Sequence, residues 1–303
     1  MRYLGPAALT AASLVLLLAT DRTVLDPAAG APGAGARRGS ELASATTPAP
    51  PRTVLPDSRA RREALPREFF SGAGFDACTA PALETMRAWW AASPYRAVGI
   101  YTSGDQRGCE QPRLTAAWVR EVRAMGWKLV PTHVGLQAPC RESATKPKRI
   151  QPARAAEQGL QEAAAAVRAL QALGLADGSP VYLDIESYPR GDAVCSQAVI
   201  EFTLGWTQAL HAAGYHSGFY SSTDSGIADL AAAARVGSSP LPDAVWYARW
   251  DDRANTVDGS GLLAPDLWID HQRIHQHHGN VEESYGGATL TVDRDQLDSL
   301  VAR

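Results

Sequence analysis

Short apolar runs alternate with longer helical stretches from Phe69 onward, and glycines close several of the helical stretches. A short apolar run is typical of a buried strand, and glycine commonly follows the last turn of a helix. The apolar runs cover residues 70–75, 97–101, 128–133, 180–185, 216–220, 244–248, 268–275 and 289–292. The clearest helical stretches cover residues 82–92, 115–125, 153–173 and 197–212. Eight strands that alternate with helices predict an α/β protein with a TIM-type (β/α)8 barrel.

The alternation weakens after the sixth predicted strand. Residues 251–266 and 277–287 lack a helical pattern. We therefore predict loops at both places and a barrel that is irregular in its last third.

The first 66 residues show no such alternation. After Arg2, an apolar run spans residues 7–19, and its length is typical of a signal peptide rather than of a membrane span. No small-x-small cleavage site follows directly, so an uncleaved N-terminal anchor is the alternative. Residues 21–66 are rich in Ala, Pro, Gly, Ser, Thr and Arg, a composition that buries too little surface to fold. We predict a signal peptide or anchor over residues 1–20, a disordered linker over 21–66 and one barrel domain over 67–303.

Composition and charge agree with a folded, exported protein. Of the 303 residues, 45% are hydrophobic and 20% are charged, which is enough apolar material for a core. The formal net charge is −3, so we expect no nucleic-acid partner. The expected location is outside the cytoplasm, either secreted or associated with the cell envelope, with an uncleaved N-terminus as the means of association.

Four cysteines lie outside the N-terminal run, and each follows one of the first four predicted strands: Cys78, Cys109, Cys140 and Cys195. An even number of cysteines in an exported protein indicates disulfides, and four cysteines allow three pairings. Loops after adjacent strands meet on one face of a barrel, which favours Cys78 with Cys109 and Cys140 with Cys195. The sequence has no Cys-x-x-Cys motif, so the cysteines do not indicate a metal site.

The most informative motif is the run VYLDIE at residues 181–186. Asp184 and Glu186 are separated by one residue, so on a strand their side chains face the same way. Barrel enzymes place their active sites at the carboxyl ends of the strands. Because two neighbouring carboxylates do not ionise independently, the pKa of one rises and that group can act as a general acid near neutral pH.

Two more predicted strands end in an acid: Asp76 follows the first and Asp293 the eighth. The first and last strands of a closed barrel are neighbours, so these two carboxylates are expected side by side. Four acids at one mouth without an evident basic partner are costly unless the site binds a cation or performs acid–base chemistry. A single strand-end aspartate can instead be a helix cap, so this prediction depends on the four together.

Aromatic side chains accompany the acids at the strand ends: Tyr101, Tyr188, Tyr220, Trp246 and Trp250. Such rings stack on the apolar faces of sugars, so they are typical of a glycan cleft. Tryptophans on the predicted helices, Trp89, Trp118 and Trp206, are expected in the core.

Histidines offer a second chemistry. His133 ends the third predicted strand and is expected to contact the substrate. A late cluster, His271, His275, His277 and His278, could ligate zinc beside the acids. The adjoining Gly279-Asn280 indicates a turn, so we assign no metal site and no cofactor.

These segments together resemble a bacterial glycoside-hydrolase-like family, once catalogued as a domain of unknown function and similar to the Chalaropsis-type lysozymes of glycoside hydrolase family 25. The resemblance covers about residues 72–298. The segments that carry it are GFDACTAP (74–81), GIYTSG (99–104), VGLQAPC (134–140), YLDIE (182–186), GFYSS (218–222) and RIHQH (273–277).

The resemblance implies a barrel that cleaves or binds peptidoglycan glycan strands. It implies that Glu186 protonates the glycosidic oxygen, while Asp184, Asp76 and Asp293 position it or stabilise positive charge at the sugar carbon. Gln137 and Gln276, in the resembling segments, are then expected substrate contacts. One departure matters: those lysozymes have Trp-Gln-Tyr where residues 275–277 here are His-Gln-His.

Our main hypothesis is a secreted glycoside hydrolase that acts on peptidoglycan or a related polysaccharide. The first alternative is a catalytically silent glycan-binding or envelope module that uses the same cleft. The second is a metal-dependent hydrolase that uses the acids and His133.

Overall fold

A computed structural model describes residues 65–303 of the protein. The signal segment or anchor predicted at residues 1–20 lies outside the described residues, as does the linker predicted at 21–66 apart from its last two residues.

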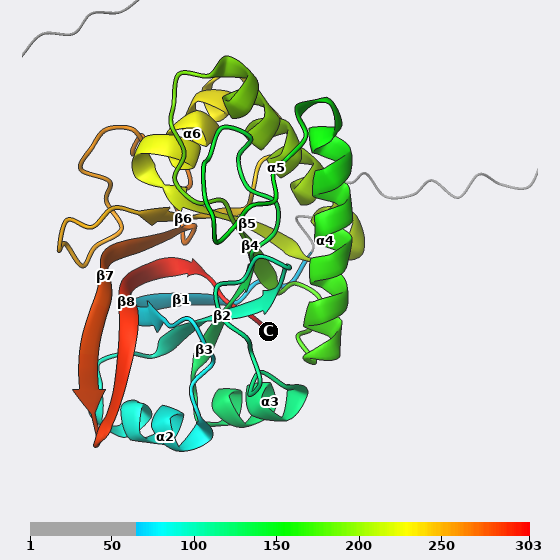
Figure 1. Ribbon diagram of the computed structural model, residues 1–303. Helices are drawn as coiled ribbons and strands as arrows, with labels where there is room; N and C mark the ends of the chain where they lie inside the picture. Colours follow the sequence, from blue (N-terminus) through cyan, green and yellow to red (C-terminus); the bar gives the residue numbers. More distant parts are fainter. Residues whose placement is uncertain (1–64) are drawn as a thin grey trace, which may run out of the picture. The chain divides into compact units, whose positions relative to one another are not determined.

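The described residues form a closed barrel of eight strands in chain order (Figure 1). The strands are β1 (Phe69–Asp76), β2 (Ala97–Ser103), β3 (Lys128–His133), β4 (Pro180–Asp184), β5 (His216–Ser222), β6 (Ala244–Ala248), β7 (Arg273–Tyr285) and β8 (Ala288–Leu300). From β1 to β7 neighbouring strands are parallel, whereas β8 is antiparallel to both β7 and β1. The predicted TIM-like barrel is confirmed, with one strand reversed.

Helices follow the first five strands on the outside of the barrel. They are α2 (Leu83–Ala92), α3 (Ala116–Ala124), α4 (Ala155–Ala172), α5 (Ala193–Ala213) and α6 (Ala228–Arg235), with a short turn η1 (Pro152–Arg154) before α4 and a π-helical turn η2 (Thr223–Ile227) before α6. The first four match predicted helices, although α5 starts earlier because the Asp192 side chain caps it by accepting from the amides of Val194 and Cys195. Within residues 65–303, no helix has the length and apolar character needed to cross a membrane.

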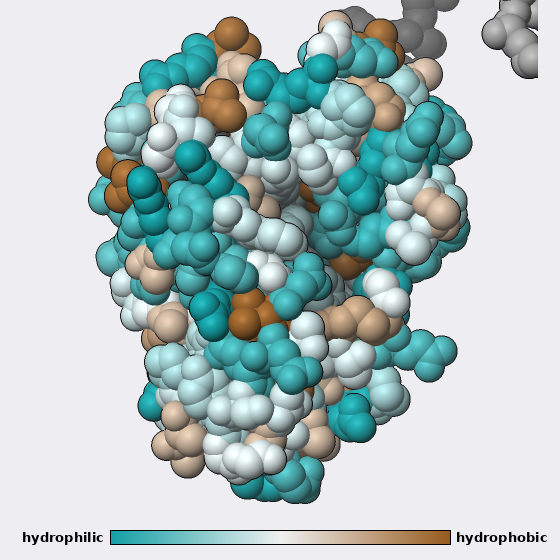
Figure 2. Space-filling view, turned by 60° about the vertical axis from the view of Figure 1, so that its left-hand side comes forward, coloured by the Kyte–Doolittle hydropathy of each residue, from teal (hydrophilic) through white to brown (hydrophobic). Residues whose placement is uncertain are grey.

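The strands separate two apolar cores because consecutive side chains alternate between their faces. In β4, Tyr182 fills the barrel interior with Trp246, while Val181 and Leu183 pack outward under the helices. The three helix tryptophans, Trp89, Trp118 and Trp206, lie in this outer core, as predicted. The exposed face in Figure 2 is mostly hydrophilic, with hydrophobic side chains in small separate groups.

The last third of the barrel differs from the prediction. The loop predicted at residues 277–287 is wrong: β7 and β8 form a long antiparallel hairpin that turns at Gly286-Gly287, both with positive φ. Two consecutive glycines of this kind are a common hairpin turn. Because the outer hairpin is partly exposed, its strands mix polar and apolar residues and lack the apolar run of a buried strand. The strand predicted at 268–275 begins only at Arg273.

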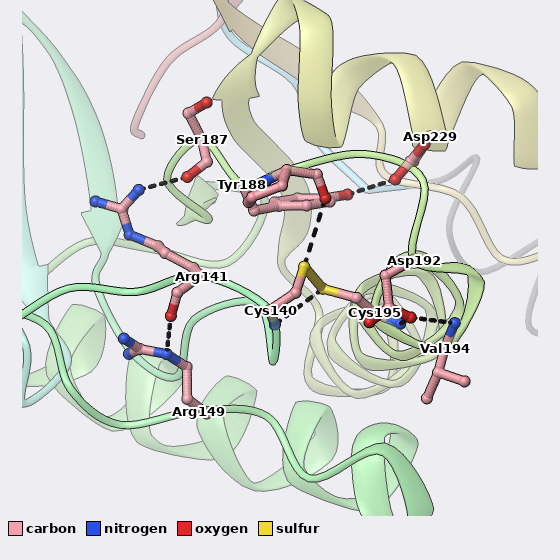
Figure 3. The surroundings of a disulfide bond; sticks show 10 residues. Cys140, Arg141, Arg149, Ser187, Tyr188, Asp192, Val194, Cys195 and Asp229 are labelled. Carbon is pink, nitrogen blue, oxygen red and sulfur yellow. Dashed lines mark hydrogen bonds between the residues drawn. A yellow bond between two sulfur atoms is a disulfide. The ribbon is translucent and has the colours of Figure 1, made fainter. Parts of the chain in front are cut away.

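Two disulfides pin the loops at the carboxyl ends of the strands. The structure joins Cys78 to Cys109 and Cys140 to Cys195, the two pairings favoured by the sequence. Figure 3 shows the second bond between the loop after β3 and the first turn of α5. The bond thereby ties down the segment between β3 and α4, which contributes to the cleft described below.

The reversed strand returns the chain to where the domain begins. The amide of Val301 donates to the carbonyl of Glu68 at 2.9 Å, and Arg303 lies against Ala176 and Ser179. Both ends of the described chain therefore lie at the amino ends of the parallel strands.

Candidate active site

The mouth of the barrel holds a cavity of about 360 Å³ at the carboxyl ends of the parallel strands. The four predicted acids line it: Asp76, Asp184, Glu186 and Asp293. Asp184 ends β4 and Glu186 follows two residues later, while the intervening Ile185 is fully buried among apolar side chains of the outer core. Alternation along the strand thus sends both carboxylates into the cavity.

Asp76 and Asp293 lie side by side for a different reason from the one expected. They are direct register partners of the β1–β8 pair. Because β8 is antiparallel, Asp293 lies within that strand rather than at its end. The predicted neighbourhood is correct, and the predicted strand direction is wrong.

A hydrogen-bond network holds Asp76 in place. Tyr101 donates its hydroxyl to Oδ1 at 2.6 Å, and Gln276 Nε2 donates to Oδ2 at 2.9 Å. Burial and, secondly, the nearby charge of Asp293 together raise the pKa of Asp76 from 3.8 to about 7, against the lowering effect of these two hydrogen bonds. Burial also raises the pKa of Asp293.

Asp184 and Glu186 share a basic partner that the sequence did not indicate. Lys146 Nζ contacts Glu186 Oε1 and lies 3.6 Å from Asp184 Oδ2, and Arg141 lies 3.9 Å from Glu186 Oε2. The expectation of acids without a basic partner is therefore wrong. Lys146 comes from the segment between β3 and α4, whose conformation the sequence pattern does not specify.

Asp184 has one carboxyl oxygen free for a ligand. It is 4% exposed, and within residues 65–303 its Oδ1 has no hydrogen-bond partner. Burial raises the pKa of Asp184 against the lowering effect of Lys146, and the net value is about 7. A carboxyl group that titrates near neutral pH inside a cavity is suited to proton transfer.

Asp295, a further acid that we did not predict, lies deeper in the barrel. It is 3% exposed, accepts from Trp246 Nε1 at 2.9 Å, and burial raises its pKa well above 3.8. Asp293 and Asp295 are separated by one residue of β8, as Asp184 and Glu186 are near β4. The same spacing rule applied to β8 would have found it.

Residues 87–297 match the family described as "Rv2525c-like, glycoside hydrolase-like domain". The chain belongs to this family. No curated protein matches it.

Several solved structures are similar to this Rv2525c-like chain at low sequence identity, and SleM shares its fold. The spore cortex lytic enzyme SleM of Clostridium perfringens is 13% identical, with a TM-score of 0.51 over 76% of this chain and 68% of that one. The Tat-secreted protein Rv2525c of Mycobacterium tuberculosis is 18% identical, with a TM-score of 0.48 over 75% and 95% of the two chains. An uncharacterized protein of B. stearothermophilus is 16% identical, with a TM-score of 0.48 over 75% and 99%.

Four of the predicted substrate contacts line the cavity of this Rv2525c-like domain: Tyr101, Tyr220, Trp246 and Gln276. Gln276 connects several of them, because its Oε1 accepts from Tyr220 at 3.0 Å and from Trp250 at 3.2 Å. Gly99 of β2 leaves space for the side chains of Asp76 and Trp246. A Cβ atom at residue 99 would lie only 2.6 Å from the Cβ of Asp76.

His133, a predicted substrate contact, does not line the cavity. It is fully buried, with Nδ1 2.8 Å from Ser103 Oγ, Nε2 against Glu162 of α4, and its ring beside Trp206 of α5. The neighbouring Thr132 lines the cavity instead, because adjacent strand residues point to opposite faces.

Gln137 and Tyr188 do not line the cavity and instead support the site from outside it. Gln137 is fully buried, donates to the Asp184 carbonyl at 2.9 Å and accepts from the Glu186 amide at 2.8 Å. Tyr188 lies beside the Cys140–Cys195 disulfide and donates its hydroxyl to Asp229 at 2.7 Å (Figure 3). Gln137 thus sets the backbone from which the carboxylates of Asp184 and Glu186 project.

The histidine cluster does not gather as a metal site. Both ring nitrogens of His275 contact backbone carbonyls, those of Asn255 and Arg249. Across residues 65–303, no group of three or more His, Cys, Asp or Glu side chains is arranged to hold a metal ion. With His133 turned away from the acids, the donors invoked for a metal-dependent hydrolase do not meet.

Proposed function

We propose that this Rv2525c-like domain is a glycoside hydrolase that cleaves peptidoglycan glycan strands by carboxylate acid catalysis. The observation that carries the proposal is the convergence of Asp76, Asp184, Glu186 and Asp293 on one cavity beside aromatic side chains. Glycosidases use a pair of carboxyl groups of which one donates a proton. SleM, which has the same fold, is named a spore cortex lytic enzyme, and this supports a cell-wall substrate.

In this mechanism Glu186 gives its proton to the glycosidic oxygen. Asp184, with a pKa of about 7, is its partner and contacts the sugar through its unpaired Oδ1. Asp76 and Asp293 stabilise the positive charge that develops at the sugar carbon. Since Lys146 contacts Glu186 Oε1 in the free protein, a bound sugar displaces the lysine from that oxygen.

The proposed location is outside the cytoplasm. Two disulfides are typical of proteins in oxidising compartments. Residues 1–20 act as signal peptide or anchor in this proposal, and residues 21–66 as a linker to the barrel domain at 67–303.

Glu186→Gln tests the catalytic assignment. We expect it to reduce the release of reducing ends from purified cell wall by at least about a hundredfold, because an amide has no acidic proton to give. Glu282→Gln is the matched control, since Glu282 is exposed on β7 and outside the cavity. Unchanged turnover by a folded Glu186→Gln protein would defeat the assignment.

A glycan-binding module without turnover is the second candidate function. The contacts of Lys146 with both β4-side carboxylates favour it, because they occupy groups that catalysis needs free. Sedimentation of the wild-type protein with cell wall, without release of reducing ends, would support this candidate over the hydrolase.

A further inference from the structure

A second cavity, of about 520 Å³, adjoins the acidic one. The two cavities share four lining side chains: Glu186, Tyr220, Trp250 and Gln276. They therefore form one continuous cleft, with the proposed acid Glu186 at their boundary. A glycan strand cleaved at Glu186 must extend past this boundary, so the second cavity is where its next unit would lie.

The walls of the second cavity are rich in hydroxyl groups. They come from η2 and the strand before it, from Ser187 and from the segment after β6, and the hydroxyl-bearing residues are Ser187, Tyr220, Ser222, Thr223 and Ser260. The hydroxyls of Ser222, Thr223 and Ser260 donate to Asp224, the Ala248 carbonyl and Asp258. Hydroxyls both donate and accept hydrogen bonds, as the hydroxyls of a sugar do. The π-helical turn η2 at this position is a rare conformation that is often found at functional sites.

The charges around this cavity favour a ligand without negative charge. Arg249 is its one cationic lining residue among those described, and it is paired with Asp251 at 3.4 Å and Asp258 at 3.1 Å. Asp224 adds a carboxylate to the lining. An acidic sugar would therefore meet no free cation there.

Trp250 presents an aromatic face between the two cavities. It is 57% exposed, although large aromatic side chains are usually buried. Its position is nonetheless fixed, because Nε1 donates to Gln276 and the ring lies over Gly279 of β7. A Cβ at Gly279 would lie 2.0 Å from the indole, so only glycine permits this placement.

We propose that Trp250 is the stacking platform of a second carbohydrate subsite, which binds a neutral pyranose next to the unit held in the acidic cavity. The inference rests on the proposed function in one respect, namely that the same strand passes Glu186. Its core is a binding claim that needs no turnover. The exposed indole can stack on the apolar face of a sugar ring, and the hydroxyl groups beside it can bond to the hydroxyls of the same sugar.

Calorimetric titration of N-acetylglucosamine and chitohexaose tests the subsite. The parent protein is Glu186→Gln, so that cleavage does not disturb the binding measurement. We expect chitohexaose to bind this parent more tightly than N-acetylglucosamine, because a single sugar unit cannot occupy both cavities. Adding Trp250→Ala should weaken chitohexaose binding roughly tenfold, the equivalent of one aromatic stacking contact, and change N-acetylglucosamine binding less.

Three controls separate stacking from a structural role. Trp250→Phe should retain most of the affinity, and Ile269→Ala, at an exposed apolar residue outside both cavities, should retain all of it. Gly279→Ala should weaken chitohexaose binding like Trp250→Ala, because it displaces the indole without removing it. Thermal melts of all variants show whether the fold is kept.

Equal chitohexaose affinity with and without the Trp250 indole would overturn the subsite, and so would the absence of saccharide binding by the parent. A wild-type protein that shows the chain-length dependence but releases no reducing ends would instead defeat the hydrolase proposal and leave the subsite standing. The two failures are therefore distinguishable.

Discussion

Asp184 and Glu186 follow the end of a parallel strand, whereas Asp293 and Asp295 lie in the middle of an antiparallel one. The partners of the first pair, Lys146 among them, come from the segment between β3 and α4. Those of the second pair come from barrel strands: Trp246 in β6, Gln276 and Asn280 in β7. One side of the cleft is therefore built by an irregular segment between strand and helix, and the other by strands of the barrel.

The two sides of the cleft therefore suit different roles in the proposed reaction. Loop partners can exchange with a substrate, so the β4 side suits proton transfer. Ladder partners keep their positions, so the β8 side suits a constant electrostatic field. Three predictions test this division.

Asp184→Asn and Asp293→Asn compare the two sides directly. We expect the first to lower kcat for release of reducing ends about a thousandfold, because it removes a proton-transfer partner. The second should lower kcat about tenfold, since it removes one charge from a fixed field. Similar losses in both variants would mean that the two sides do not divide the work.

Lys146→Met removes the movable partner. Turnover should rise roughly tenfold, because the substrate no longer breaks a partly buried ion pair. Lys146 lowers the pKa of Asp184, so the limb of the pH–rate profile that Asp184 sets should also move to higher pH.

The conservative Lys146→Arg variant should keep the wild-type pH profile. A lower turnover of Lys146→Met with that limb unmoved would assign Lys146 to substrate binding instead.

Asp295→Asn probes the fixed side through stability. Burial raises the pKa of Asp295 above 3.8, so the folded protein holds this proton more tightly than the unfolded one. The stabilisation that comes from this tighter proton binding is complete below pH 3.8, and it declines as the pH rises toward the pKa of the folded state. The amide stays neutral, so the variant should melt about 3 °C higher than wild type at neutral pH, roughly 1 kcal/mol. This gain should vanish in acid, and a gain that persists there would have another cause.

The sequence predicted those parts of the molecule in which apolar and polar residues repeat regularly along a strand or helix. Alternation placed Asp184 and Glu186 on one face, and the loops after adjacent strands paired the cysteines correctly. Contacts from irregular segments left no such signal, so Lys146 was missed. His133 was expected on the cavity side of its strand. The alternation along β3 instead turns the side chain of Thr132, one residue earlier, toward the cavity. The exposed part of the β7–β8 hairpin was missed because its strands have no buried apolar run.

The reversal of β8 also separates the two ends of the described chain from the cleft. Glu68 and Val301 bond to each other at the amino ends of the parallel strands, and the cleft opens at the carboxyl ends. Residues added at the carboxyl end, such as a purification tag after Arg303, would therefore start on the side of the barrel opposite the cleft and leave its opening uncovered.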